Sequence, residues 1–347
     1  MKLEKIFKEA VDRNASDIYI TTGTRPVFRI SGNLVVLEDQ LVLTNESASA
    51  YLFDLMTEEQ VNEFKKKMDL DFGVDVPGVA RLRVNIFVQR KGIGGVFRLI
   101  PSRIPTMDEL GLPESVKKIP QIPSGLILVT GPTGSGKSTT LAAIIDDINN
   151  NTDAHIITIE DPIEFVYENR KSVVDQREVH SHTESFQNAL RAALREDPDV
   201  ILVGEMRDFE TIALAITAAE TGHLVLATLH TSGAAKTIDR IINVFPGDRQ
   251  SQVRSELAEA LQAVVWQQLL KTKDGKGRVG AHEILFMNTA VSNLIREDKT
   301  NQILQVIETG AKEGMQTMQA SVLSLLARDL ITREEAAGSL PDGLPTH

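Results

Sequence analysis

The sequence predicts an α/β protein of two domains, an α+β domain followed by a domain built on a parallel β-sheet. Three observations support this class. The first hundred residues alternate helical periodicity with strand-like runs that glycines interrupt. A proline-rich stretch follows them. Beyond it, short apolar runs alternate with helical segments, which is typical of buried parallel strands.

The first predicted domain spans residues 1–100. Apolar groups at helical spacing over 3–11 predict a helix, and three strand-like runs follow, at 18–20, 26–30 and 34–37. Residues 44–67 return to helical periodicity, with a capping-box start at Thr57, and 71–99 are again strand-like. We expect residues 101–123 to form a linker with a short helix inside, because four further prolines follow Pro101: Pro105, Pro113, Pro120 and Pro123.

The second predicted domain has its core in residues 124–288. Its predicted strands are the apolar runs 126–130, 156–159, 200–203 and 224–228. From about Gln250 we expect mostly helix, and residues 289–347 are predicted to be a helical C-terminal region.

Composition excludes several classes of protein. A formal net charge of -11 disfavours a broad electrostatic grip on nucleic acid or anionic lipid. The chain has no cysteine, which rules out disulfides and thiolate zinc sites. The N-terminus lacks the apolar core of a signal peptide, and no apolar run approaches the ~18 residues of a membrane-spanning helix. We therefore expect a cytoplasmic protein that reaches a membrane only through a partner.

A phosphate-binding loop is the strongest motif. The pattern G-x-x-x-x-G-K-[ST] directly follows the predicted strand 126–130 and directly precedes a predicted helix, which are its two confirming contexts. Backbone N–H groups of such a loop surround phosphate oxygens, Lys137 supplies a cation to the β- and γ-phosphates, and the Ser138 hydroxyl can ligate magnesium. The predicted nucleotide-binding residues are Gly131, Pro132, Thr133, Gly134, Ser135, Gly136, Lys137, Ser138 and Thr139.

Acidic side chains follow two of the predicted strands. Glu160, Asp161 and Glu164 come after the second strand, and Glu205 comes after the third. The carboxyl ends of parallel strands face the ligand crevice of an α/β sheet. One acid is expected to hold the metal and another to orient or deprotonate the attacking water, although some of them could instead cap helices or pair with Arg207. Spacing alone does not assign the base.

Two histidines bracket the fourth predicted strand. Either His223 or His230 could donate to a γ-phosphate, although a histidine at a strand end is usually a structural, hydrogen-bonded residue.

Several arginines could serve the reaction from a neighbouring subunit. An arginine supplied to a transferring phosphoryl group is typically worth ~10³ to 10⁵ in rate. The candidates are Arg81, Arg83, Arg98, Arg103, Arg191 and Arg195, and for each a solvated surface role is an equally good interpretation.

Taken in order, four motifs resemble those of the secretion ATPase superfamily, and most closely its branch that retracts type IV pili. Residues 131–139 look like its Walker A motif, 159–165 its Asp box, 204–208 its Walker B motif and 221–231 its His box. The resemblance spans nearly the whole chain.

The resemblance implies a PAS-like N-terminal domain, a RecA-like C-terminal domain and a homohexamer that hydrolyses ATP with Mg²⁺. It assigns Glu164 to polarise water, Glu205 to act through magnesium together with Ser138, and His230 to contact the nucleotide. The arginines that reach the nucleotide align best with Arg83, Arg98 and Arg103. The implied partner is a platform protein of the inner membrane, with the motor at the inner face of the cytoplasmic membrane.

Alternatives stay open at this point. A related motor could drive pilus extension or protein secretion, and a small-molecule kinase or a nucleotide-gated scaffold is a third possibility. The absence of an extra N-terminal domain and of a four-cysteine element favours the retraction branch. One departure is the segment 290–295, where Ser292 stands at the position of an arginine in the family's C-terminal motif.

Overall fold

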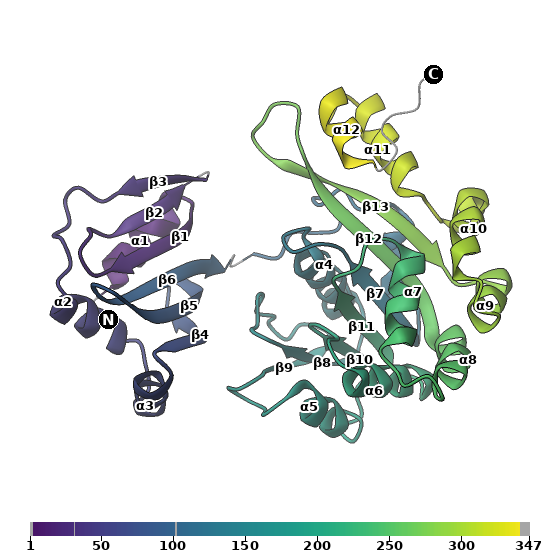
Figure 1. Cartoon of the computed structure of the whole chain (residues 1–347), viewed down its shortest axis with the longest axis horizontal. Coiled ribbons are helices and arrows are strands. Elements are labelled where there is room, and N and C mark those ends of the chain that lie inside the picture. The colour runs from purple at the N-terminus through teal and green to yellow at the C-terminus, as the bar shows by residue number, and fades with distance from the viewer. Residues whose placement is uncertain (1–2, 31, 101–102, 341–347) are drawn as a thin grey trace. The chain divides into compact units, whose positions relative to one another are not determined.

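The computed structural model describes residues 3–30, 32–100 and 103–340 (Figure 1). It divides the chain into two compact units. One consists of Met1–Arg103 together with Pro162–Val166, and the other of Ile104–Asp161 together with Tyr167–His347. The predicted domain bounds stay predictions, and residues 101 and 102 of the predicted linker lie outside the described residues.

The first unit is built on an antiparallel sheet with the strand order β3-β2-β1-β6-β5-β4. Alternation along β5 shows why these residues form a sheet with one covered face: Leu82, Val84 and Ile86 are buried, while the residues between them face away from the core. The elements of this unit are α1 (Glu4–Asp12), β1 (Ala15–Thr21), β2 (Val27–Ile30), β3 (Asn33–Val36), α2 (Asn45–Phe53), α3 (Glu58–Lys67), β4 (Asp69–Val76), β5 (Ala80–Gln89) and β6 (Gly92–Ile100).

The predicted capping box at the start of α3 is confirmed. The Thr57 hydroxyl accepts a hydrogen bond from the Gln60 N–H at 3.2 Å, and the Gln60 side chain accepts one from the Thr57 N–H at 3.0 Å. Two of the free N–H groups at the helix start are thereby satisfied.

The second unit is built on a mixed sheet with the strand order β13-β12-β7-β11-β10-β8-β9. All neighbours from β12 to β9 are parallel, and β13 is antiparallel to β12. The strands are β7 (Gly125–Thr130), β8 (His155–Glu160), β9 (Val173–Glu178), β10 (Val200–Val203), β11 (Leu224–Leu229), β12 (Leu261–Lys271) and β13 (Arg278–Phe286). The four predicted parallel strands are confirmed as β7, β8, β10 and β11.

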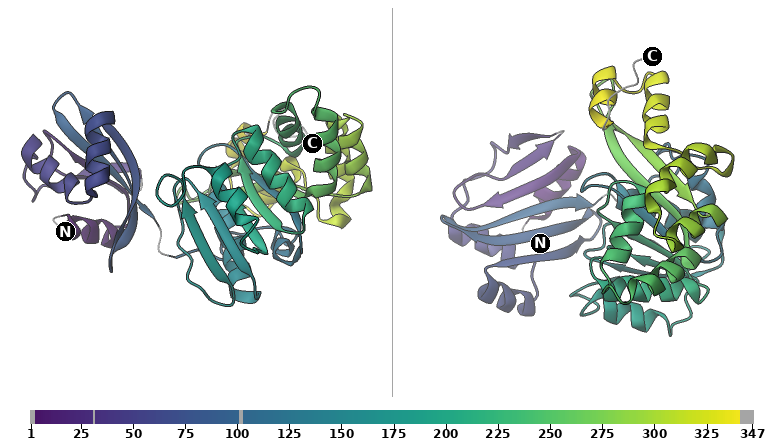
Figure 2. Two further views of the ribbon diagram at one scale, coloured as in Figure 1. Left: turned by 90° about the horizontal axis from the view of Figure 1, so that it is seen from below. Right: turned by 45° about the vertical axis from the view of Figure 1, so that its right-hand side comes forward.

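Helices cover both faces of this sheet (Figures 1 and 2). The helix that follows the phosphate loop, α4, packs with the short helix η1, while α5 to α8 contribute to the large apolar core on the other face. Their bounds are η1 (Val116–Gln121), α4 (Lys137–Asn151), α5 (Phe186–Ala193), α6 (Phe209–Glu220), α7 (Ala234–Asn243) and α8 (Gln250–Ala260).

The expectation of mostly helix from Gln250 onward is wrong for β12 and β13, which form a long antiparallel hairpin. The run Ala263–Trp266 is rich in β-branched and aromatic residues, and these favour a pleated surface covered on both sides. The turn contains Gly275 at φ 68°, a left-handed conformation that suits glycine.

The C-terminal region is helical, as predicted, as far as the structure describes it. It contains α9 (Thr289–Arg296), η2 (Thr300–Gln302), α10 (Ile303–Thr309), η3 (Gly310–Glu313), α11 (Met318–Ala327) and α12 (Arg333–Ser339). Residues 341–347 lie outside the described residues. Within the described ranges, none of the helices combines the length and apolar character needed to cross a bilayer.

A buried histidine in β13 makes the stability of this hairpin depend on pH. Burial lowers the pKa of His282 to about 4, so the unfolded chain takes up a proton from pH 6.5 downward while the folded chain stays neutral. The contribution of neutral His282 to the unfolding free energy is fully present above pH 6.5 and is lost as the pH falls through 4. We expect a loss of about 3 kcal/mol in unfolding free energy relative to His282→Gln.

The measurement is denaturant unfolding at a series of pH values, followed by the emission of Trp266, which pairs with Glu283 beside His282. His180→Asn, at an exposed loop histidine with φ 69°, is the control and should retain the wild-type pH dependence. Equal pH dependence in wild type and His282→Gln would contradict this account.

Candidate active site

The candidate site lies where four neighbouring strands end at one edge of the second sheet. In the strand pairing, Thr130 of β7 lies opposite Leu229 of β11, and Val203 of β10 lies opposite Ile159 of β8. The residues that follow these strands are therefore neighbours although they are far apart in sequence. They are Gly131, Gly204 and His230, and Glu160, the last residue of β8, lies at the same edge.

Glycines give the phosphate loop its shape. Gly131, Gly134 and Gly136 have positive φ angles of 147°, 77° and 86°, which other residues rarely adopt. A Cβ on Gly131 would lie 2.4 Å from the carbonyl oxygen of Gln267, so this position also lacks room for a side chain. The loop can take this path only with glycine.

The side chains of the loop differ in exposure. Pro132, Thr133 and Gly134 are exposed, Ser138 and Thr139 are half-buried, and Lys137 is buried. The Lys137 ammonium donates to the carbonyl oxygens of Gly131 and Pro132, at 3.0 and 3.1 Å. It is thereby held across the mouth of the loop.

The loop fits a phosphate anion. Two buried hydroxyls, Thr130 Oγ1 and Ser135 Oγ, have no hydrogen-bond partner among the described residues. The first turn of α4 has no side-chain cap, so its N–H groups and the positive end of its dipole face the loop. Donors without acceptors, together with an uncapped helix start, are what a phosphate group requires.

Sequence analysis missed a residue that braces this loop. Gln267 of β12 is buried; its amide nitrogen donates to the Ser135 carbonyl at 2.6 Å and its amide oxygen accepts from the Thr140 hydroxyl at 2.9 Å. It therefore ties the loop and the start of α4 to the next strand. A glutamine within the apolar run 263–270 was the available signal.

Glu205 and His230 are brought together, as their places after β10 and β11 predict. Glu205 lies 3.3 Å from the His230 ring and 2.8 Å from the Arg207 guanidinium. Burial raises the pKa of the Glu205 carboxyl, but the hydrogen bond and charge of Arg207, with a contribution from His230, outweigh burial and leave the pKa below its ordinary value. Glu205 is therefore ionised at neutral pH, as a magnesium-associated carboxylate must be.

The other acidic candidates lie at the end of β8 and after it. Glu160 is next to Gly204 and accepts a hydrogen bond from the Thr158 hydroxyl at 2.7 Å. Asp161 is exposed. Glu164 is half-buried in an irregular segment that belongs to the first compact unit.

His223 does not share this edge. It precedes β11, so it lies at the opposite end of a six-residue strand from His230, about 20 Å away at the usual rise. Its ring contacts the carbonyl oxygen of Ala218 at 2.8 Å, at the end of α6. The structural interpretation of His223 is therefore correct. Arg191 of α5 pairs with Glu210, and Arg195 lies in the turn beyond the end of α5.

Arg83 and Arg98 belong to the first unit, where they are cross-strand neighbours on β5 and β6. Arg83 pairs with Asp71 at 2.9 Å, and Arg98 with Asp17 of β1 at 3.0 Å. Asp17 is buried and so fixes one end of the Arg98 guanidinium while two thirds of the Arg98 side chain stays exposed. Arg103 ends the first of the two stretches of chain that make up this unit.

Comparison with known proteins gives a family match over most of the chain. Residues 1–337 match the model of the family described as type II/IV secretion system protein. A relative from Pseudomonas aeruginosa, named type IV pilus retractation ATPase PilT, is 52% identical over 336 residues, which cover 97% of each chain. A twitching motility protein from Neisseria gonorrhoeae is 54% identical over 313 residues, 90% of this chain and 83% of the relative.

A solved structure agrees with these matches. The crystal structure of the pilus retraction motor PilT with bound ADP superposes with a TM-score of 0.92 at 47% identity and covers 99% of this chain and 98% of that one. This likeness confirms the predicted α/β class, with a PAS-like α+β first part, a RecA-like phosphate-loop part and a helical C-terminal region. The chain belongs to the type II/IV secretion system protein family.

Proposed function

We propose that the chain is an ATP-hydrolysing motor that powers type IV pilus retraction. The observation that carries the proposal is the phosphate loop, with Glu205 and His230 at the same sheet edge, in a chain 52% identical to a pilus retraction ATPase over nearly its full length. Members of this family act as ATPases, and a motor of this kind releases free phosphate instead of transferring it to a substrate.

Residues 131–139 bind the phosphates of ATP in this proposal. Lys137 leaves the two loop carbonyls to contact the β- and γ-phosphates, and the unpartnered hydroxyl of Ser135 gains an acceptor. Ser138 and Glu205 would hold Mg²⁺, and the bound ion would supply positive charge against the charge that develops on the phosphates. Glu164 polarises the attacking water, and His230 contacts the γ-phosphate beside Glu205.

A homohexameric ring completes the active site in this proposal. Arg83, Arg98 and Arg103 of one subunit stabilise the transferring phosphoryl group bound by its neighbour. The ring acts at the inner face of the cytoplasmic membrane, through a platform protein. A net charge of -11 supports a protein partner over nucleic acid.

Substitutions of Lys137 and Glu164 should separate nucleotide binding from ATP hydrolysis. Glu164→Gln should lower ATP turnover by about 10²- to 10⁴-fold while ADP affinity stays within about threefold, because a general base acts on water and not on the bound phosphates. Lys137→Ala should lose nucleotide binding itself. Phosphate release and calorimetric ADP binding measure the two effects. Glu168→Gln, an exposed glutamate in the same segment, is the matched control, and full turnover by Glu164→Gln would refute the role assigned to it.

Subunit mixing tests whether the arginines act between subunits. Lys137→Ala and Arg98→Ala rings should each be inactive, but random mixing should restore about a quarter of the sites, namely those with Lys137 from one subunit and Arg98 from the next. Phosphate release after exchange of subunits is the readout. Mixing Lys137→Ala with Glu205→Gln should restore no activity. Lys137 and Glu205 both lie in the second unit, so each site takes both residues from the same subunit. Equal results from both mixtures would show that Arg98 acts within its own subunit.

The direction of the motor is tested in cells that encode the protein. Deleting the gene should increase surface pili and abolish twitching, and wild type but not Glu164→Gln should reverse both effects. Pili are counted by electron microscopy and twitching by colony spreading. Bald cells would instead identify an extension motor, and an unchanged pilus count would point to secretion.

A further inference from the structure

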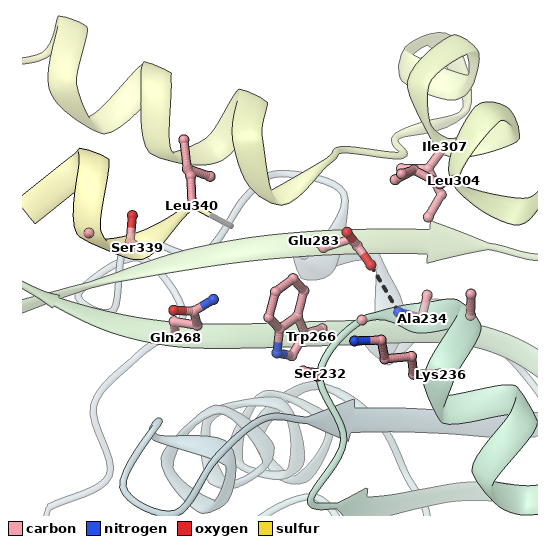
Figure 3. Close-up of a pocket in the computed structure, with 13 residues that line it drawn as sticks. Ser232, Ala234, Lys236, Trp266, Gln268, Glu283, Leu304, Ile307, Ser339 and Leu340 are labelled. Atoms are coloured by element: carbon pink, nitrogen blue, oxygen red, sulfur yellow. Dashed lines mark hydrogen bonds between the residues drawn. The ribbon is translucent and has the colours of Figure 1, made fainter. Parts of the chain in front are cut away.

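A pocket of the second unit lies beside the candidate active site but is not part of it. Its volume is about 480 Å³, within the range of small-molecule sites. Figure 3 shows that β12, β13, the start of α7, α10 and the end of α12 surround it. Its apolar lining includes Trp266, Leu304, Ile307 and Leu340.

A lysine lies beside Trp266 on one side of the pocket. The indole nitrogen of Trp266 is buried and has no acceptor among the described residues, so Trp266 presents its ring to the pocket and not its N–H. The Lys236 side chain is on the same side of the pocket as the indole nitrogen in Figure 3, and it has no ion-pair partner among the described residues.

The acidic group of the pocket is already occupied. Glu283 accepts hydrogen bonds from the backbone N–H groups of Ala234, at 2.9 Å, and of Met318. Its carboxylate therefore accepts hydrogen bonds from backbone N–H groups at the starts of α7 and α11. The groups that face a ligand are therefore the Lys236 ammonium, the polar side chains of Ser232, Gln268 and Ser339, and the apolar walls.

We propose that this pocket binds a small amphipathic anion. The apolar body of the ligand packs against the Trp266 ring, Ile307 and Leu340, and its carboxylate or sulfonate group accepts from the Lys236 ammonium. The ligand thus supplies the anion that Lys236 lacks among the described residues.

Two segments couple the pocket to the nucleotide site. Gln267, which braces the phosphate loop, lies between the two β12 residues that line the pocket, Trp266 and Gln268. The segment from His230 to Ala234 begins at the Glu205 contact and ends in the pocket wall. Occupancy of the pocket therefore changes nucleotide affinity, and by linkage the nucleotide changes the affinity for the anion. This coupling rests on nucleotide binding at the phosphate loop and not on pilus retraction.

Trp266 is the single tryptophan of the chain and reports directly on the pocket. The probe is anilinonaphthalene sulfonate, an amphipathic anion that accepts excitation energy from tryptophan. In the full-length protein we expect saturable energy transfer from Trp266 to the probe. Lys236→Met should weaken binding about tenfold, because a charge-assisted hydrogen bond is lost. Lys276→Met, at an exposed lysine outside the pocket, is the control.

Gly338→Leu should block the pocket. A Cβ at Gly338 meets no heavy atom within 4 Å, and leucine is a better helix former than glycine, so the side chain can fill space without unfolding α12. Gly247→Leu, at another glycine with open space, is its control. We expect energy transfer to be lost in Gly338→Leu and retained in Gly247→Leu.

Several results would overturn the proposal: no transfer in wild type, transfer that survives Gly338→Leu, or equal losses in the controls. Coupling is tested by adding ADP, which should shift the affinity for the probe in wild type but not in Lys137→Ala. An affinity unchanged by ADP in wild type would overturn the coupling. Because the readout is binding, these outcomes are independent of whether the motor retracts pili.

Discussion

The phosphate loop depends on a strand that is not adjacent to it in sequence. Gln267 of β12 forms hydrogen bonds with the Ser135 carbonyl and the Thr140 hydroxyl, and its own carbonyl oxygen lies only 2.4 Å from where a Cβ on Gly131 would stand. The loop therefore keeps its shape only if β12 lies parallel to β7 in the observed register, with Trp266 opposite Thr130. Pre-organisation of this kind lets a loop bind phosphate without first ordering itself.

The same strand connects the loop to the C-terminal helices. β13 pairs with β12, and its buried Glu283 accepts from Ala234 at the start of α7, three residues beyond Thr231 of the His box, and from Met318 at the start of α11. Moving either helix away would remove a hydrogen-bond donor from the buried Glu283 carboxylate. Such a movement is costly, because a buried charge needs its hydrogen-bond partners. The segment from His230 to Ala234 and this one carboxylate therefore link the edge of the candidate site to the start of α11.

Local sequence signals predicted the parts of the fold that local chemistry determines. The phosphate loop, the capping box at Thr57 and the four buried strands of the second unit were predicted because glycine conformation, a helix cap and an apolar run each act over a few residues. β12 was missed because both of its faces are covered, which removes the alternation that marks a strand. Gln267 and Asp17 were missed as positioning residues because their partners, Ser135 and Arg98, are set by strand register and not by spacing.

Register also explains how the first unit presents its arginines. Arg29, Asp17, Arg98 and Arg83 follow one another across β2, β1, β6 and β5. Like charges on neighbouring strands repel, and here the buried Asp17 and the exposed Asp71 offset that repulsion by pairing with Arg98 and Arg83. The carboxylates approach from the sides, and two thirds of the Arg98 side chain remains open to solvent. A row held in this way has fixed guanidinium positions and spare positive charge. A further anion would relieve the remaining repulsion, which is the property needed of a surface that completes a phosphate site bound by another subunit.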